Sequence, residues 1–421
     1  MKSLHLTNSW HARSGGIATF YRALLDEAER QGRDMAMVIP GEQDGCERRT
    51  HTRIYTVRGT PSPFNPSYRV ILPNAWPGIN RRVAEIVREE QPDLIEVCDK
   101  YSLHYLAGLI RRGLFSLPHR PVLIGLSCER MRDSVAAYIA SGPLADRLSR
   151  FYMKWLYFAF FDHHLTVSTH TADELRDAGR GHVRQRGVWI RPMGVDLANF
   201  SPHLRNAAFR HQLARRAQGN ADSRLVLYAG RLVPEKNLPL LLDTFEQLLA
   251  DHDADYRLIV AGDGILRPSL MEQAEKRFPG YSLWLGHLED REALARLYAN
   301  ADIFLHTNPH EPFGISPLEA MASGVPVVLP NSGGVLSYAD ASNAILAEPD
   351  PASMATGVRR VFTTDPTERI AQARTTALRY DWTVIARDFL DLYAGFLRGE
   401  SPAQPDFLST PGSWLGLETG N

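Results

Sequence analysis

The sequence predicts an α/β protein built from two doubly wound, Rossmann-like domains. Its 421 residues exceed what one ordinary hydrophobic core accommodates, which favours two domains. Short apolar runs rich in Val, Ile and Leu alternate with longer amphipathic segments, a pattern typical of parallel sheets with helical crossovers. Because 44 % of the residues are apolar and 23 % are charged, the chain has enough apolar surface for such cores and is not extensively disordered.

Two series of apolar runs predict the strands of the two domains. The first series is residues 4–7, 35–40, 94–98, 122–127 and 164–168, and the second is residues 224–230, 256–262, 281–286, 301–306, 325–330 and 343–348. Pro, Gly and Asn cluster between them in "RPMGVDLANFSPHL". We therefore expect an N-terminal domain over residues 1–192, a C-terminal domain over 193–380, a helix over 381–398 that crosses back to the first domain, and a tail over 399–421.

The distribution of charge differs between the two halves of the chain. Residues 1–192 carry 27 Lys and Arg against 20 Asp and Glu (+7), whereas residues 193–421 carry 20 against 28 (−8). A basic half suits an anionic surface or substrate, and scattered solvated arginines are the alternative interpretation. We expect no nucleic-acid partner.

Targeting signals and cysteine usage indicate a cytoplasmic protein. The amino terminus lacks the long apolar stretch of a secretory signal, and no run reaches the ~18 apolar residues that a membrane span requires. Cys46, Cys98 and Cys128 are unevenly spaced and form no CxxC pair, so we expect reduced thiols. "DHDAD" at 251–255 superficially resembles an Asp-x-Asp metal site, but it lies in a polar connector before a strand, and we expect no metal site there.

Two glutamates surround a predicted helix start in "ADIFLHTNPHEPFGISPLEAMASG". With Ser316 as N-cap and Pro317 at the first helical position, Glu319 completes a capping box, which gives it a structural explanation. Glu311 lies upstream in the loop, beside Pro312, and has no such explanation.

The turn between these glutamates suits a phosphate group. Phe313, Gly314 and Ile315 expose backbone N–H groups at the positive end of a helix. An acid next to a phosphate site binds hydroxyl groups, so Glu311 and this turn together point to a sugar nucleotide.

Further candidate residues follow other predicted strands. Arg231 and Lys236 in "LYAGRLVPEKNLPLLLDTF" offer two cations to a diphosphate, although such residues in a loop are mostly solvated surface. Gly15 and Gly16 precede an amphipathic helix and permit close approach of a ligand, or form an ordinary tight turn. Gly262 in "VAGDG" lines the cleft between the domains or merely reverses the chain.

These segments together resemble a known family. "GGIATF", "GVDLANFSP", "GRLVPEKN", "AGDG" and "HEPFGISPLEAMASGVPVV", in this order and spacing, look like the retaining glycosyltransferases of family 4. The resemblance extends to about residue 395. It implies the GT-B fold, in which two Rossmann-like domains face a central cleft and a C-terminal helix crosses back to the N-terminal domain.

The resemblance also implies a role for each candidate residue. Glu311 would contact donor-sugar hydroxyls, and Glu319 would bind the ribose. Arg231 and Lys236 would hold the diphosphate. The amides of Phe313, Gly314 and Ile315 would meet the sugar or the β-phosphate, and Gly16, after Gly15, would approach the phosphates from the other domain. No metal or other cofactor would then be obligatory.

The acceptor side departs from the family pattern. Many relatives place a histidine after a first-domain strand, where this chain has "VLIGLSCERMRDS", so that Ser127, Glu129 and Arg130 occupy the neighbourhood. Packing of this loop is the alternative to a role with the acceptor. Further on, "RLSRFYMKWLYFAFFDHH" predicts a buried helix, and a helix resting on an anionic membrane is the alternative.

We therefore expect a retaining, metal-independent hexosyltransferase. Its donor would be a nucleoside diphosphate sugar, GDP-mannose or a UDP-hexose, and its acceptor a hydroxyl of a glycan or a lipid-linked sugar. A lipid-linked acceptor would bring the basic domain into peripheral contact with the inner face of the membrane. The alternatives are a sugar-nucleotide epimerase or phosphorylase of GT-B fold and a non-catalytic sugar-nucleotide-binding subunit. A dinucleotide-binding dehydrogenase is disfavoured because no G-x-G-x-x-G follows the first strand.

Overall fold

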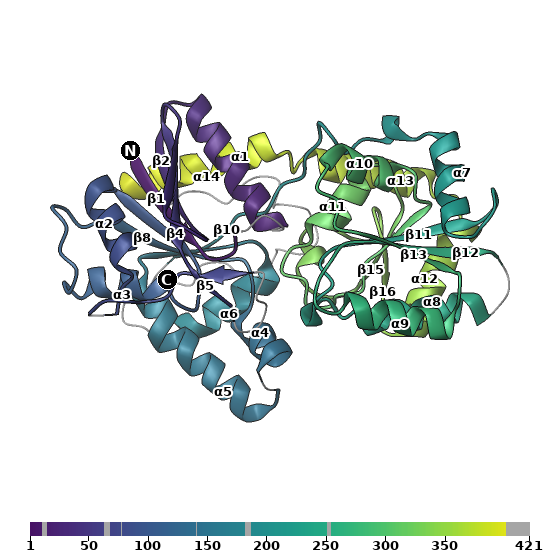
Figure 1. Cartoon of the computed structure of the whole chain (residues 1–421), viewed down its shortest axis with the longest axis horizontal. Helices are drawn as coiled ribbons and strands as arrows, with labels where there is room; N and C mark the ends of the chain where they lie inside the picture. Colours follow the sequence, from purple (N-terminus) through teal and green to yellow (C-terminus); the bar gives the residue numbers. More distant parts are fainter. Residues whose placement is uncertain are drawn as a thin grey trace.

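The computed structural model describes residues 1–10, 15–62, 68–76, 78–139, 141–181, 187–250 and 254–400. Residues 251–253 of "DHDAD" and residues 401–421 of the expected tail lie outside the described residues. The described chain forms two α/β bodies side by side (Figure 1), each with a largely parallel sheet between helices. This confirms the predicted α/β class with two Rossmann-like domains.

The N-terminal sheet has the strand order β10-β9-β8-β7-β1-β2-β4-β3. All neighbours pair in parallel except β3 and β4. Its strands are β1 (Lys2–Thr7), β2 (Asp34–Gly41), β3 (Gly45–Arg48), β4 (Thr52–Arg58), β7 (Leu94–Cys98), β8 (Val122–Ser127), β9 (His163–Thr166) and β10 (Gly187–Ile190), with a separate ladder of β5 (Thr60–Pro61) and β6 (Arg69–Val70). Its helices are α1 (Gly16–Arg30), α2 (Arg81–Glu90), α3 (His104–Arg111), α4 (Met131–Tyr138), α5 (Pro143–Tyr152), η1 (Met153–Tyr157), η2 (Phe158–Phe160) and α6 (Thr169–Gly179).

The C-terminal sheet is parallel throughout, with the order β13-β12-β11-β14-β15-β16. Its strands are β11 (Arg224–Ala229), β12 (Tyr256–Ala261), β13 (Ser282–Gly286), β14 (Ile303–Leu305), β15 (Val327–Pro330) and β16 (Ile345–Ala347). Its helices are η3 (Pro202–Leu204), α7 (Ala207–Arg216), η4 (Pro234–Lys236), α8 (Leu238–Ala250), α9 (Arg267–Arg277), α10 (Arg291–Ala299), α11 (Ile315–Ala322), η5 (Gly334–Ser337), α12 (Pro351–Thr363) and α13 (Thr367–Leu378). Because β11 and β14 are neighbours, the loops after these two strands meet at the same sheet edge.

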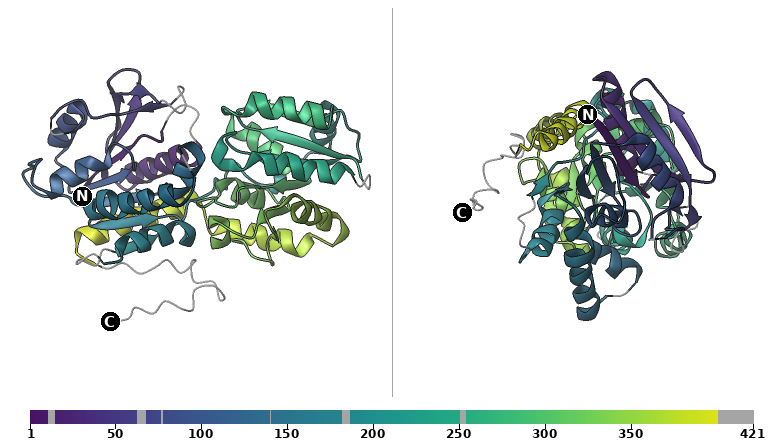
Figure 2. Two further views of the ribbon diagram at one scale, coloured as in Figure 1. Left: turned by 90° about the horizontal axis from the view of Figure 1, so that it is seen from below. Right: turned by 90° about the vertical axis from the view of Figure 1, so that its left-hand side faces the viewer.

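The last helix, α14 (Trp382–Leu397), leaves the C-terminal domain and packs against α1. It lies along the N-terminal domain as the yellow helix of Figures 1 and 2. Aromatic contacts hold it there, including Phe20 with Phe389, whose ring centroids are 4.8 Å apart. Polar contacts also hold it: the Tyr393 hydroxyl donates to Glu96 Oε2, and Arg33 Nη2 lies 2.7 Å from Asp391 Oδ1.

The buried carboxylate of Glu96 lies in the middle of β7, where every residue is buried. It accepts hydrogen bonds from Tyr21 at 2.8 Å and from Tyr393, and His5 Nδ1 lies 3.0 Å from Oε1. A buried charge is tolerated only with such partners. This cluster therefore joins β1, β7, α1 and α14 into one core.

The aromatic segment of residues 147–164 divides at the end of α5. Tyr157, Phe158, Phe160 and Phe161 are buried, as predicted. The prediction of burial is wrong for α5 itself, whose apolar side chains are exposed. Among the described residues, no helix is both long and apolar enough to cross a bilayer.

Candidate active site

Glu311 and Lys236 form a buried ion pair at the edge where the loops after β14 and β11 meet. Lys236 Nζ donates to both carboxylate oxygens of Glu311, at 2.9 and 2.8 Å. Asn308 Nδ2 donates to Oε2 at 3.0 Å, and His306 Nε2 lies 3.2 Å from the same oxygen. The two charges, 75 residues apart in the chain, therefore share one site.

These contacts keep Glu311 ionised. Burial by itself raises the pKa of a carboxyl group. The charge of Lys236 and the contact with His306 outweigh this effect and lower the pKa of Glu311 well below its ordinary value. The site therefore presents a carboxylate that accepts hydrogen bonds and does not donate them.

Helix α11 begins two residues earlier than the sequence predicts, at Ile315 instead of Pro317. Gly314 is its N-cap, with φ of +91°, and no side chain caps the helix. The predicted capping box of Ser316, Pro317 and Glu319 is therefore wrong. A glycine at positive φ turns the chain into the helix directly. An added side chain would also lie 2.9 Å from the Tyr338 hydroxyl, which donates to the Gly314 carbonyl at 2.7 Å.

Glu319 is buried on α11 and held by two donors from α10. The Tyr298 hydroxyl donates to Oε2 at 3.1 Å, and Arg291 Nη1 lies 3.2 Å from Oε1. Burial raises the pKa of Glu319 although Arg291 opposes it. Glu319 is therefore tied to α10 and takes no part in capping its own helix.

The first turn of α1 faces the first turn of α11. A Cβ atom built on Gly16 would lie 2.5 Å from Cδ1 of Ile315, so only glycine leaves this contact undisturbed. Gly15 is the exposed N-cap of α1. Each helix end carries backbone N–H groups without intrahelical partners and the positive end of a dipole. Two such ends from different domains therefore converge next to the loop of Phe313 and Gly314.

Arg231 occupies a different position from Lys236. Its Nη2 lies 3.1 Å from Glu235 Oε1, and the Tyr138 hydroxyl of α4 donates to Oε2 of the same glutamate. Arg231 thus stands where the loop after β11 meets the N-terminal domain, whereas Lys236 points to Glu311.

Gly262 packs directly on the neighbouring strand end. Its φ is +150°, and an added Cβ would lie 1.8 Å from the Gly230 carbonyl oxygen. The backbone N–H of Gly262 donates to Gly286 at 2.8 Å. This close approach of chain segments is sufficient to require a glycine.

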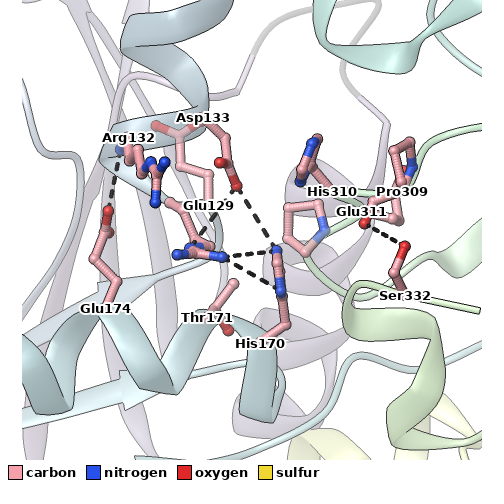
Figure 3. A network of polar contacts seen from close by, with 12 residues as sticks. Glu129, Arg132, Asp133, His170, Thr171, Glu174, Pro309, His310, Glu311 and Ser332 are labelled. Carbon is pink, nitrogen blue, oxygen red and sulfur yellow. Dashed lines mark hydrogen bonds and ion pairs between the residues drawn. The ribbon is translucent and has the colours of Figure 1, made fainter. Parts of the chain in front are cut away.

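The candidate acceptor residues lie at and just after the end of β8, and Figure 3 shows Glu129 among them. Ser127 is buried, and its hydroxyl donates to the Glu129 carbonyl at 3.1 Å. Glu129 Oε1 accepts from the Tyr101 hydroxyl at 2.9 Å. Arg130 Nη1 lies 3.4 Å from His170 Nε2. Ser127 therefore serves the turn, while Glu129 and Arg130 are only partly buried.

Asp133, His170 and His310 form a group that sequence reasoning missed, and it links the domains (Figure 3). One ligand atom from each lies within 4.8 Å of the others. The charge of Arg130 beside His170 opposes a metal ion there. Burial raises the pKa of Asp133, but its bond with His170 and the charge of Arg130 lower it overall.

Other contacts at this boundary also escaped the sequence analysis. The Ser168 hydroxyl donates to the Pro312 carbonyl at 2.5 Å across the domains. The Gly334 N–H donates to the Glu311 carbonyl at 2.6 Å and fixes the backbone of that loop. Of the residues that the sequence analysis missed, Asn308 was the easiest to predict as a partner of Glu311, because it lies three residues before Glu311 in the same loop.

Two protein-family models match this chain. The model for glycosyltransferase family 4 matches residues 14–199, and that for glycosyl transferases group 1 matches residues 211–376. A GDP-mannose-dependent alpha-(1-6)-phosphatidylinositol dimannoside mannosyltransferase of Mycobacterium tuberculosis is 29 % identical over 394 residues, which cover 93 % of this chain and 95 % of the relative. A GDP-mannose-dependent alpha-mannosyltransferase of the same species is 28 % identical over 334 residues, which cover 78 % of this chain and 79 % of the relative.

Solved structures show the same fold. Sucrose-phosphate synthase from Thermosynechococcus elongatus superposes with a TM-score of 0.73 at 20 % identity, covering 95 % of this chain and 100 % of that chain. The Anabaena protein HepE in complex with UDP and glucose superposes with a TM-score of 0.67 at 18 % identity, covering 94 % and 100 %.

Proposed function

The chain belongs to glycosyltransferase family 4, and we propose that it is a retaining hexosyltransferase with GDP-mannose as its first candidate donor. The names of the mannosyltransferase relatives favour GDP-mannose over a UDP-hexose. The acceptor is a hydroxyl of a glycan or of a lipid-linked sugar. The name of the phosphatidylinositol dimannoside relative favours the lipid-linked class.

The observation that carries this proposal is the buried Glu311–Lys236 pair beside two converging helix starts. The hydroxyl groups of a sugar donate hydrogen bonds to acceptors such as the carboxylate oxygens of Glu311. The negative charge of a diphosphate is stabilised by N–H groups and cations. Lys236, the first turns of α1 and α11 and the nearby Arg231 supply the second requirement. Glu319, beside Arg291, is the residue that we assign to the ribose hydroxyls.

The same contacts favour a front-face reaction. Both oxygens of Glu311 are engaged by Lys236 and Asn308, which leaves the carboxylate poorly placed to attack carbon as a nucleophile. In the proposed step the acceptor oxygen bonds to the anomeric carbon as the bond to the diphosphate oxygen breaks. The acceptor proton passes to the departing phosphate, and the positive groups stabilise the charge that develops there.

We propose that the transfer needs no metal ion, and the distribution of positive charge supports this. Lys236, Arg231 and the two helix ends supply positive charge without an ion. Transfer in the presence of excess EDTA tests this part, and loss of activity that Mg²⁺ or Mn²⁺ restores would contradict it. The proposed location is the cytoplasm, where nucleotide sugars are available.

Replacement of Glu311 by alanine tests the central assignment. We expect glycosyl transfer or slow donor hydrolysis to fall by at least about a hundredfold, since a positioned polar group in the transition state contributes on this scale. Nucleoside diphosphate binding should survive. Unchanged turnover would refute the role of Glu311, and failure of every nucleotide sugar with the unaltered chain would refute the transferase proposal.

A thermal-shift comparison of GDP, UDP and ADP identifies the donor base. A ligand that binds only the folded protein raises the midpoint of unfolding by mass action. We expect GDP to give the largest shift, and a larger shift with UDP would reassign the donor.

A further inference from the structure

Helix α5 carries an exposed apolar stripe on the N-terminal domain. Leu144, Leu148 and Phe151 of α5 and Trp155 of the following turn η1 are spaced four, three and four residues apart, and their exposed fractions are 70 %, 60 %, 57 % and 50 %. This spacing places side chains on one face of a helix. Ile139, at the end of α4, is also 69 % exposed. A contiguous apolar surface of this kind marks an interaction site.

Exposed cations run beside the stripe. Arg147 and Arg150 lie on the surface of α5 and make no ion pair with any residue that the structure describes. Lys154 follows one helical turn after Arg150, and its Nζ lies 5.5 Å from the centre of the Trp155 ring. The helix thus has an apolar face with a basic flank, the arrangement of helices that rest in a membrane interface.

The acidic side chains near this flank are already engaged. Asp146 Oδ1 lies 2.9 Å from Arg132 Nε. Glu174 accepts from the backbone N–H groups of Met131 and Arg132, at 2.9 and 3.1 Å. The positive charge of Arg147 and Arg150 is therefore not cancelled locally and is directed to solvent.

A cavity of about 230 Å³ connects this surface with the candidate acceptor loop. Four cations and three carboxylates line it, namely Arg130, Arg132, Arg150, Lys154, Asp146, Glu174 and Asp177, together with apolar and small side chains. Arg130 also belongs to the domain boundary beside His170, so the cavity leads from the basic flank of α5 towards the active site. Figure 1 shows α5 as the projecting lower tip of the N-terminal domain, with α4 between it and the C-terminal domain.

We infer that the α5 surface, defined by Leu144, Leu148, Phe151, Trp155, Arg147 and Arg150, seats the protein on an anionic lipid bilayer. The stripe enters the boundary between headgroups and acyl chains, and the arginines meet lipid phosphates. A second copy of the chain fits this surface less well, because a two-fold contact along α5 would bring identical arginines together. This inference rests on the proposed function, because a lipid-linked acceptor would lie in such a bilayer.

Vesicle co-sedimentation of the full chain, without donor or acceptor, tests the inference apart from the transferase activity. We expect binding to vesicles of equal parts phosphatidylcholine and phosphatidylglycerol, weaker binding in high salt, and little binding to phosphatidylcholine alone. Equal binding to both vesicles, or none to the anionic ones, would overturn the inference even if transfer were intact.

Two double variants separate the apolar and the charged contributions. We expect Leu148→Ser with Phe151→Ser to weaken binding at least about tenfold, because two large apolar side chains no longer leave water. Arg147→Glu with Arg150→Glu should weaken it at least about 25-fold, at roughly fivefold for each cation near an anionic surface. All four positions are exposed, so the unfolding midpoint should stay within about a degree of the unaltered chain.

Matched controls lie on the C-terminal domain and α14. Leu378 and Val384 are exposed to 51 % and 49 %, and replacing both by serine should leave vesicle binding unchanged. Arg215→Glu with Arg216→Glu on α7 should likewise have little effect. Light scattering measures oligomeric state in parallel: a dimer that the α5 serine variant dissociates, with vesicle binding unaltered, would assign the surface to a second copy and overturn the inference.

Discussion

Replacement of Lys236 by methionine removes the counter-charge of Glu311 while keeping an unbranched side chain in its place. The exposed fractions of the two side chains are only 15 % and 10 %, so water replaces little of the lost interaction. Removal of one partner from a buried pair destabilises a protein by about 3–5 kcal/mol. Because Asn308 and His306 still contact Glu311 in this variant, we expect the free energy of unfolding to fall by about 3 kcal/mol, the lower end of that range.

The dependence of this loss on pH identifies its cause. In the unaltered chain the pKa of Glu311 is lowered, so its contribution to stability is fully present above the unfolded value of about 4.3 and is lost as the pH falls through the folded value. In Lys236→Met the lysine charge no longer opposes the effect of burial, and we expect the pKa of Glu311 to rise above the unfolded value. Protonation then relieves the buried carboxylate, so the difference between the two chains should be larger at pH 7 than at about pH 5.

Urea denaturation followed by circular dichroism, at both pH values, measures this difference. Glu311→Gln and the double variant complete a thermodynamic cycle, and the double variant should be less destabilised than the sum of the single variants. The buried-pair explanation would be refuted if Lys236→Met lowered the free energy of unfolding equally at the two pH values. It would also be refuted if the losses of the two single variants added up to the loss of the double variant.

Three further predictions concern other contacts. Tyr393→Phe removes a hydrogen bond to the buried Glu96 and should destabilise the chain by about 1.5–3 kcal/mol in urea, with donor affinity unchanged; a stability equal to that of the parent would contradict the anchoring of α14. Glu319→Ala should weaken binding of the nucleoside diphosphate by about 10- to 100-fold in calorimetry, with less effect on inorganic diphosphate, if the ribose hydroxyls bind this carboxylate. Gly16→Val inserts a side chain towards Ile315 and should lower transfer at least about tenfold without altering the unfolding midpoint, as measured by initial rates and a thermal melt.

The strands that sequence reasoning found share one physical property. Strands such as β7 and β11 are buried on both faces, so they are continuous apolar runs and stand out from their surroundings. Strand β4 escaped notice because exposed and buried residues alternate irregularly along it, and β3 because all four of its residues are exposed. Edge strands depend on pairing with a neighbour, and a pattern of residue types does not report that pairing.

That Glu311 and Lys236 lie in one site could be anticipated because both follow strand ends on one side of a parallel sheet, but their direct ion pair was not predicted. The start of α11 could not, since the sequence offers Ser316 as a plausible cap and the φ of Gly314 depends on Tyr338 and Val335 around it. The exposure of α5 could not be predicted either. Its apolar spacing fits a buried face as well as an exposed one, and only the packing of the opposite face, where Ser149 and Met153 are buried, decides between them.

The connections between the two domains lie side by side. The described part of the chain crosses twice: Val195 N donates to the Tyr380 carbonyl at 2.7 Å, and Trp382 N donates to the Val195 carbonyl at 3.3 Å. Gly194 permits this approach, since an added Cβ would lie 2.6 Å from the Trp382 ring. Near the site the domains meet through the hydrogen bond of Ser168 with Pro312 and through the contact of Gly16 with Ile315, whereas apolar packing fixes α14 to the N-terminal domain. We propose that the domains rotate about these paired crossings, which would separate Gly16 from Ile315 and let a donor enter between the two helix starts.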